Sequence, residues 1–220
     1  YSTATETAAC AAMDESENTY SSLLIQPAKQ GFIVKLANEL ISDAGFDIEA
    51  SIAENAGVAI GTRVNTIVNT AVEAVATQGV AAADATAITA DELVSLAFSV
   101  DGMARMLPGA GFMVNTATLA KIRKLKDGNG AYILDVVAGG PSTILGYPVY
   151  ENPAVDDSTT GLKSVLFGHW PSVKIATTGL ETSVSSDAYF ANDITGYRFT
   201  YRVGAAVANG ASHIKYLIQD

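Results

Sequence analysis

The sequence predicts an α+β fold in which long helices and strands are intermixed. Apolar residues recur every three or four positions between residues 41 and 67, which is the period of an amphipathic helix. Between residues 197 and 204, apolar residues alternate with Arg, Thr, Arg and Gly, which is the period of a half-buried strand. The segments lack the regular spacing of βαβ units, so a doubly wound parallel sheet is not expected.

The composition indicates a sizeable core and a surface that other subunits partly cover. The chain has 220 residues, which is enough for one large domain or two small ones. Hydrophobic residues make up 49% and charged residues 16%, so few charged groups are present to solvate the surface of a lone monomer. The formal net charge of -10 opposes sequence-independent binding to nucleic-acid phosphates.

Three further features narrow the class of protein. Cys10 is the single cysteine, so the chain forms no intrachain disulfide. The sequence has neither a run of about 18 apolar residues nor a signal peptide, so no membrane span is expected. Because the chain begins at Tyr1 rather than Met, we expect a fragment or a processed product.

The first 36 residues are expected to be extended. Residues 1–19 are rich in Ala, Thr, Ser and acids, and they lack the large apolar residues of a core. We therefore expect an exposed arm there. The segment "TYSSLLIQPAKQGFIVKL", residues 19–36, also suggests extended structure, and Pro27 argues against a central strand position around it.

A long amphipathic helix of about six turns is expected next. Its apolar face consists of Ile41, Ile48, Ile52, Ala56, Ala59, Ile60 and Ile67. Ser42 or Asp43 is expected to cap its first turn. Gly57 and Gly61 lie inside this pattern, where they are either a flat strip for the approach of another backbone or two tolerated glycines.

The middle of the chain carries clear helix and turn signals. Residues 71–88 are rich in Ala, Val and Thr, and we expect a loop with short strands. In "TADEL", Thr89 and Glu92 form a capping box that starts a helix, and Pro108 ends it at the latest. The segment "GFMVNTATLAKIRKLKDGNGAYIL", residues 111–134, predicts a strand to Val114, a helix capped by Asn115 or Thr116, a turn at "DGNG" and a strand at "AYIL". Further strands are expected in "SVLFGHWPSVKIAT", "LETSVSS" and "YRFTYRVGAAV".

No catalytic, cofactor-binding or metal-binding residue is predicted. The imidazole candidates are His169 and His213, and His169, beside Trp170, is interpreted as a packed, hydrogen-bonded residue. Motifs for a nucleophile elbow, a zinc site or a phosphate loop are absent from the sequence. The remaining charged clusters are attributed to local structure, namely a solvated turn for Asp156 and Asp157, capping for Asp91 and Glu92, and the dipole at a helix end for Lys121, Arg123, Lys124 and Lys126. A local basic patch remains the alternative for the last group.

The order and spacing of five segments carry a resemblance to a known family. These segments are "DESENTYSSLLIQPAKQGFIVKLANELISDAG", "GFMVNTATLAKIRKLKDGNGAYIL", "ILGYPVY", "SVLFGHWPSVKIATTGLETSVS" and "YFANDITGYRFTYRVGAAVANGASHIKYL". Together they resemble the major capsid proteins of tailed bacteriophages, which have the Hong Kong 97-like fold. The second segment is the most specific match, and the resemblance covers nearly the whole chain.

The resemblance implies an α+β Hong Kong 97-like capsid fold with a long spine helix, a peripheral domain and an axial domain. Residues 1–30 are expected to form the descending arm of the family's extended loop. Residues 31–70 and 173–207 are expected to form the peripheral domain with the spine helix. Residues 71–172 and 208–220 are expected to form the axial domain around the centre of a capsomer.

The resemblance also identifies departures from the family pattern. Some members cross-link subunits through an isopeptide bond between Lys and Asn, promoted by a Glu. The corresponding positions carry Met13, Asp193 with Asn192 beside it, and Thr200, so cross-linking is not expected here. The family's N-terminal arm and the ascending strand of its extended loop have no counterpart. We therefore expect these 220 residues to give a folded monomer or an isolated ring rather than a closed shell.

The function implied by the resemblance is structural rather than enzymatic. We expect a subunit of a tailed-phage or prophage icosahedral capsid that self-assembles into pentameric and hexameric capsomers enclosing the genome. The alternative is an encapsulin-like nanocompartment shell, and a hydrolase using His169 with an acid is disfavoured by the missing motifs. The implied partners are copies of the chain, together with scaffold, portal and maturation protease proteins. Contact with packaged DNA is expected to be only indirect, and contact with a membrane is not expected. The implied location is the virion capsid, assembled in the bacterial host cytoplasm.

Overall fold

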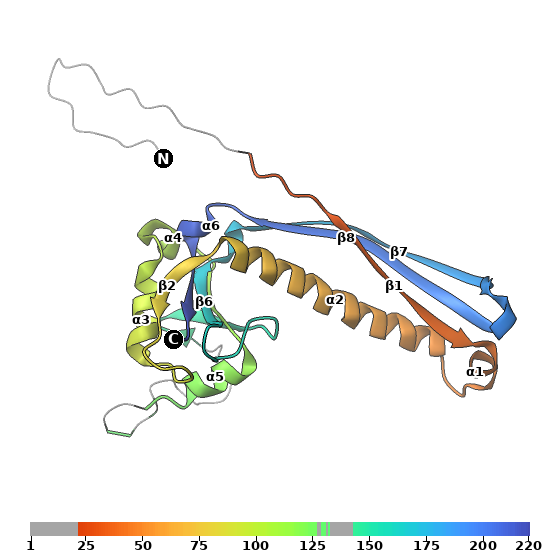
Figure 1. Ribbon diagram of the computed structural model, residues 1–220, viewed down its shortest axis with the longest axis horizontal. Coiled ribbons are helices and arrows are strands. Elements are labelled where there is room, and N and C mark those ends of the chain that lie inside the picture. Colours follow the sequence, from red (N-terminus) through yellow and green to blue (C-terminus); the bar gives the residue numbers. More distant parts are fainter. Residues whose placement is uncertain (1–21, 127–128, 131, 133–142) are drawn as a thin grey trace, which may run out of the picture.

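The computed structural model shows an elongated arm joined to a compact end (Figure 1). The structure describes residues 22–126, 129–130, 132 and 143–220. The arm is a long three-stranded sheet with one long helix along it. The compact end is built around a six-stranded sheet. The expected mixture of helices and strands is confirmed.

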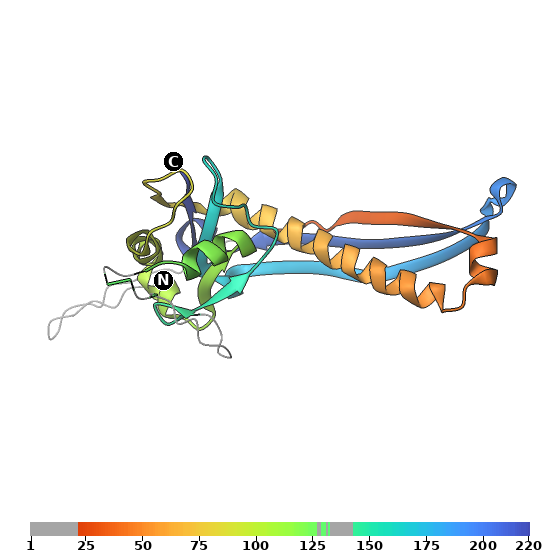
Figure 2. The ribbon, with the colours of Figure 1, turned by 90° about the horizontal axis from the view of Figure 1, so that it is seen from below.

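The arm consists of three strands, two helices and a short turn of 3-10 helix. The strands are β1 (Ala28–Ala37), β7 (Val173–Tyr189) and β8 (Ile194–Val207), the helices are α1 (Asn38–Asp43) and α2 (Ile48–Val75), and the 3-10 turn is η2 (Phe190–Asn192). The antiparallel order is β1-β8-β7, so β8 is central and β1 is an edge strand, as Pro27 just before it suggests. Figure 2 shows α2 running along the sheet for most of the arm's length.

Alternation along β8 explains how α2 is held. Tyr197, Phe199, Tyr201 and Val203 are buried, as the sequence predicted, while Arg198 and Arg202 are exposed. Phe199 stacks on Phe32 of β1 with ring centroids 5.2 Å apart. Tyr197 and Phe199 form one cluster with Ala56 of α2, and the Tyr197 hydroxyl donates a hydrogen bond of 2.8 Å to Glu49. The core of the arm is therefore a single thin layer.

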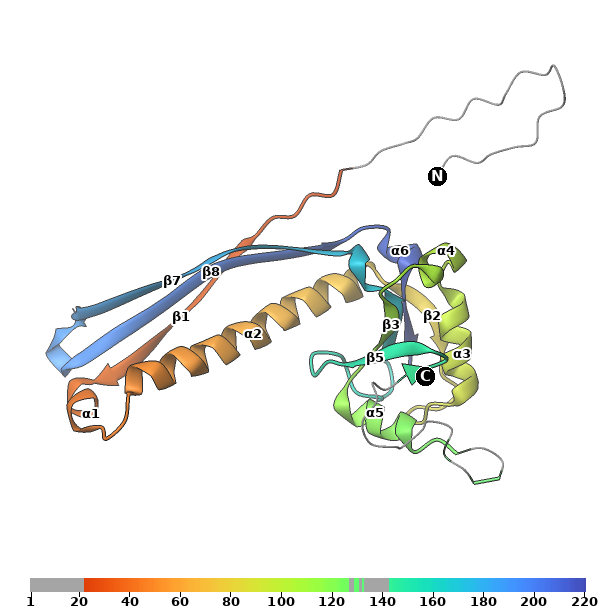
Figure 3. The ribbon, with the colours of Figure 1, turned by 180° about the vertical axis from the view of Figure 1, so that it is seen from behind.

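The compact end has the strand order β2-β9-β6-β3-β5-β4 (Figure 3). The strands are β2 (Thr77–Ala81), β3 (Ala110–Val114), β4 (Thr143–Ile144), β5 (Tyr147–Glu151), β6 (Lys163–His169) and β9 (Ile214–Ile218). The helices are α3 (Ala90–Ser99), α4 (Gly102–Met106), α5 (Thr116–Arg123) and α6 (Gly210–His213), with a 3-10 turn η1 (Trp170–Ser172). The core includes fully buried Phe112 and Phe167, whose ring centroids are 4.5 Å apart.

Several local signals in the sequence are confirmed. Thr89 and Glu92 form both halves of the capping box at the start of α3. β3 ends at Val114, and the Asn115 side chain caps α5 by accepting a hydrogen bond from the Ala117 amide. Leu119 and Ile122 are the buried apolar face of α5. The turn at "DGNG" and the strand at "AYIL" fall largely outside the described residues.

The expected bounds of the long helix were wrong at both ends. The helix begins at Ile48, capped by Asp47, and not at Ser42 or Asp43, because α1 is a separate short helix that ends at Asp43. It continues to Val75, so the expected loop from residue 71 is wrong for its first five positions. Asn69 and Val72 are buried there, and the Asn69 side-chain amide donates a hydrogen bond of 2.8 Å to the Ala154 carbonyl. These tertiary contacts keep a β-branched stretch helical.

The two glycines of α2 have no close neighbour in this chain. Gly57 and Gly61 are exposed, and a Cβ added to either would meet no atom of the described chain within 4 Å. Ala59, expected on the apolar face, is exposed as well. This side of α2 therefore faces away from the three-stranded sheet.

Candidate assembly surfaces

The arm presents long strand edges. Because β8 lies between β1 and β7, each outer strand has one edge that pairs with no other strand in the described part of the chain. β7 is 17 residues long, and nearly all of its side chains are exposed. An unpaired edge offers a row of N–H and C=O groups to another chain. The β7 edge is therefore a candidate surface for subunit contacts.

Large apolar side chains are exposed at both ends of the molecule. On α3 and α4 of the compact end, Phe98 is 66% exposed and Met106 is 80% exposed, with the Arg105 guanidinium 4.1 Å from the Phe98 ring centroid. At the far end of the arm, Phe46 and Phe190 are 68% and 83% exposed. Large apolar side chains that are exposed together on a surface are typical of contact sites for another protein.

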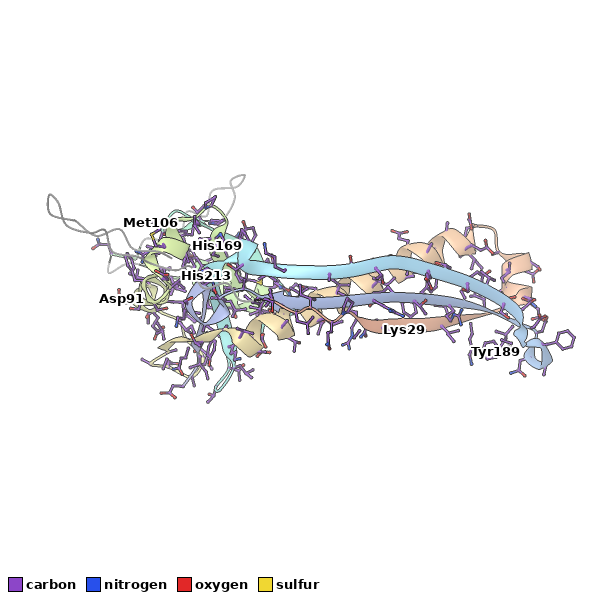
Figure 4. All side chains as sticks on the ribbon, turned by 90° about the horizontal axis from the view of Figure 1, so that it is seen from above. Lys29, Asp91, Met106, His169, Tyr189 and His213 are labelled. Atoms are coloured by element: carbon purple, nitrogen blue, oxygen red, sulfur yellow. The ribbon has the colours of Figure 1, made fainter. Side chains whose placement is uncertain are left out.

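The sheet face that turns away from α2 is basic, and we call it the outer face. Directly paired residues of antiparallel strands share a face, so the register assigns to it Lys29 and Lys35 of β1, Arg198 and Arg202 of β8, and Lys174 of β7. Glu181 is the acid on this face within the paired positions. Figure 4 looks onto the outer face and labels Lys29. This concentration of cations contrasts with the net charge of -10.

The two histidines meet at the junction between arm and compact end (Figure 4). His169 Nδ1 lies 2.9 Å from the Ser172 hydroxyl, which lies 2.8 Å from His213 Nδ1, and the ring centroids are 6.0 Å apart. Ser172 is in the link from β6 to β7, and His213 is just before β9. The interpretation of His169 as a packed, hydrogen-bonded residue is confirmed. The two hydrogen bonds of Ser172 therefore join the segment that connects β6 to β7 with the segment that connects β8 to β9, and both segments run between the two sheets.

The other charged clusters mostly serve local structure. The Asp157 carboxylate accepts a hydrogen bond from the Ser158 amide at 2.7 Å and lies 3.9 Å from the Lys121 ammonium. Lys121 also bonds to Ser158, so it is not part of a free basic patch. The Glu92 carboxylate is engaged by the amides of Ala83 and Thr89. In each case, backbone groups or neighbouring side chains account for the charge.

Of the positions aligned with the cross-linking residues, two can be located. Asp193 is in a left-handed turn at the tip of the arm, with φ of 51°, and its carboxylate accepts a hydrogen bond of 2.6 Å from Nδ2 of the Asn38 side chain. Thr200 lies on the outer face of β8, between Arg198 and Arg202. Met13 falls outside the described residues. The engaged Asp193 carboxylate therefore has a structural role at the tip.

Three groups in different parts of the described chain have shifted pKa values. Burial raises the pKa of the Glu73 carboxyl above its usual 4.5, while the Asn69 amide, which donates to it, acts in the opposite direction. The hydrogen bonds from the Thr86 and Ala87 amides lower the pKa of the exposed Asp84. Burial and the neighbouring Glu49 raise the pKa of Tyr197. Sequence reasoning missed Glu73, because it lay in a segment expected to be loop.

The part of the chain that the structure describes offers no candidate for a metal centre or a membrane span. No group of three His, Cys, Asp or Glu side chains gathers there. None of the described helices is both long and apolar enough to cross a bilayer.

Comparison with known proteins gives one family and a set of similar folds. The model of the phage capsid family matches residues 2–217. The capsid of a native GTA particle has a similar structure, with a TM-score of 0.75 and 22% identity over 89% of this chain and 74% of that one. A structure from Microbacterium phage Oxtober96 has a TM-score of 0.71 and 17% identity over 99% and 81%. A structure from Gordonia phage Cozz has a TM-score of 0.68 and 16% identity, over 99% of this chain and 80% of that one. No curated protein sequence matches the chain significantly.

Proposed function

The chain belongs to the phage capsid family and is a structural capsid subunit, and on this premise we propose that its copies form pentameric and hexameric capsomers of an icosahedral shell. The shell would enclose the genome of a tailed phage or prophage. The observation that carries this proposal is the family match over residues 2–217. The similar phage and GTA capsid structures support it and do not favour an encapsulin-like compartment.

The exposed surfaces fit a subunit that is covered by its own copies. The unpaired edge of β7 and the exposed Phe98 and Met106 lie on different parts of the molecule. A ring requires two different contact surfaces on each subunit, since one surface must meet the other on the next copy. We propose that α3 and α4 contribute one of these surfaces in the ring.

The presence of two separate sheets supports a proposed division into domains. We propose that residues 31–70 and 173–207, with α2 as spine helix, form the peripheral domain, and that residues 71–172 and 208–220 form the axial domain. Because α2 continues to Val75, we propose that the boundary lies a few residues after residue 70. We also propose residues 1–30 as the descending arm of an extended loop.

The finer aspects of the biology are part of the same proposal. We propose that the chain has no catalytic role and no bound cofactor or metal, and that it assembles in the cytoplasm of the bacterial host before it resides in the virion capsid. Scaffold, portal and maturation protease proteins are the proposed additional partners. The hydrogen-bonded environment of His169 supports a structural role for this histidine rather than a catalytic one.

Native mass spectrometry of the purified chain tests the proposed assembly. We expect complexes of five and six copies as the concentration rises. Phe98→Glu and Met106→Glu should each abolish the rings while leaving the melting temperature nearly unchanged, because both side chains are exposed in the monomer. Val58→Glu, a matched exposed apolar position on α2, is the control for α3 and α4. Rings that persist in both α3–α4 variants would contradict the assigned surface, and a chain that stays monomeric throughout would contradict the proposal that these 220 residues are sufficient to form rings.

A further inference from the structure

An open groove lies at the junction of the arm and the compact end. It has a volume of about 730 Å³ and is lined by the ends of α2, α3 and β8, by α6 and by the start of β9. Its apolar part includes Val75, which is 40% exposed, and Ala211, which is exposed as well. A groove of this size has room for several side chains of another protein.

Two exposed methionines lie on another side of the compact end. Met103 and Met106, three positions apart on α4, are 64% and 80% exposed, and neither lines the groove. In Figure 4, Met106 is near one margin of the compact end, whereas α2 ends and β2 begins near the opposite margin. His213, the last residue of α6, lies between them. The methionines and the groove are therefore separated by the body of the compact end.

Two different surfaces on different sides are what a ring of identical subunits requires. A capsid subunit assembles with copies of itself, and in a ring each copy offers one surface to one neighbour and the other surface to the next. Methionine suits the contact, because its unbranched, flexible side chain fills irregular apolar spaces. The methionines of one copy and the groove of the next are therefore complementary in shape and in chemistry.

The charges near the two surfaces are compatible with this contact. Arg105 of α4 lies over the Phe98 ring and forms no ion pair with a described residue. The Asp101 carboxylate of the groove caps the start of α4 and also lacks an ion pair within the described chain. The Lys215 ammonium of the groove donates a hydrogen bond of 2.6 Å to the Thr77 hydroxyl. An incoming Arg105 would therefore find one carboxylate without a cationic partner.

We propose that the groove receives Met103 and Met106 of the next copy in a ring. The contact rests on the proposed assembly into rings and supplies the second surface that such a ring needs. Its stability comes mainly from apolar surface that both copies remove from water.

Separate variants block the two surfaces in the full chain. Met103→Glu/Met106→Glu places charges on α4 and leaves the groove intact, whereas Ala211→Arg or Ser212→Arg fills the groove and leaves the methionines intact. All four positions are exposed, so the melting temperatures should stay close to that of the unaltered chain. In native mass spectrometry, each variant should need at least about a tenfold higher concentration to form rings, as expected for the loss of one well-packed anchor. Ala59→Arg, at an exposed alanine of α2, is the matched control and should form rings like the unaltered chain.

A mixture of the two kinds of variant tests the pairing directly. Ala211→Arg retains its methionines and Met103→Glu/Met106→Glu retains its groove, so one intact contact can form between the two while further growth is blocked. We expect dimers with one copy of each variant, no rings, and no dimers of either variant alone. Absence of the mixed dimer would overturn the proposal, and so would dimers that form equally well from one variant alone.

The proposed function and the contact fail in different ways. If the unaltered chain and the groove variants form rings at the same concentration, the assembly stands and the groove contact is wrong. If the unaltered chain stays monomeric at every concentration, ring formation by these 220 residues is wrong and the contact fails with it.

Discussion

Phe199→Ala should open the arm while leaving the compact end folded. Phe199 is 4% exposed and stacks on Phe32, and it is one of three buried apolar residues that join β8 to α2. Truncating a buried Phe to Ala costs about 3–5 kcal/mol, of which the aromatic stack accounts for about 0.5–1.5 kcal/mol. Whole domains are stable by only about 5–15 kcal/mol, so the thin layer of the arm loses a large part of its stability.

Hydrogen exchange followed by mass spectrometry reads this effect segment by segment. At a concentration where the chain is monomeric, backbone amides of β1, α2 and β8 should lose protection, while those of β3 and β6 keep it. Ser183→Ala, on the exposed outer face of β7, should change stability by less than about 0.5 kcal/mol. Equal loss of protection in both parts of the molecule would refute the view that the arm has its own separable core.

Three further substitutions test the packing of the compact end and the junction. Glu73→Gln should stabilise the chain at neutral pH, because burial raises the pKa of the Glu73 carboxyl in the folded state. Below pH 4.5 the carboxyl is protonated in both the folded and the unfolded state, so it does not destabilise the fold. The destabilisation grows as the pH rises above 4.5 through the folded-state pKa, and the Gln variant lacks it. Urea unfolding at pH 4 and pH 7.5 measures this, and an equal difference at both pH values would contradict the sign. Ser172→Ala removes the hydroxyl between His169 and His213 and should lower the free energy of unfolding by about 1–3 kcal/mol in the same assay. An unchanged free energy of unfolding would show that these hydrogen bonds do not stabilise the junction. Thr89→Ala removes the capping box of α3 and should cost about 0.5–2 kcal/mol by thermal unfolding, whereas Thr89→Ser should cost much less.

Local signals in the sequence were reliable where short-range geometry decides the structure. The capping box at Thr89 and the cap at Asn115 involve residues two or three positions apart, so the sequence contains both partners of each hydrogen bond. The buried alternation of β8 follows from the two faces of a strand. The family could also be identified from the order of five segments, and the family match over residues 2–217 confirms it.

The bounds of α2 show where local reasoning failed. Residues 71–75 mix Ala and Glu, which favour helices, with Val, which favours strands, so the composition of this segment does not decide between helix and loop. Burial of Asn69 and Val72 decides for the helix, and their contacts are with the region around Ala154, which is 85 residues from Asn69. The candidate surfaces were missed for the same reason, since Lys29, Arg202 and Lys174 come from distant strands.

The mixed α+β class, two helix caps and the capsid family could be predicted from the sequence, because each depends on short-range pattern or on segment order. Tertiary structure decided which strands pair, where α2 ends and which charges meet. β2, for example, pairs in parallel with β9 although Thr77 and its partner Lys215 are far apart in the chain. Lys29 meets Arg202 only because β1 adds to the edge of β8 in that register. Such contacts arise from the burial of apolar faces across the whole fold, which fixes strand register and thereby brings together side chains that no local pattern relates.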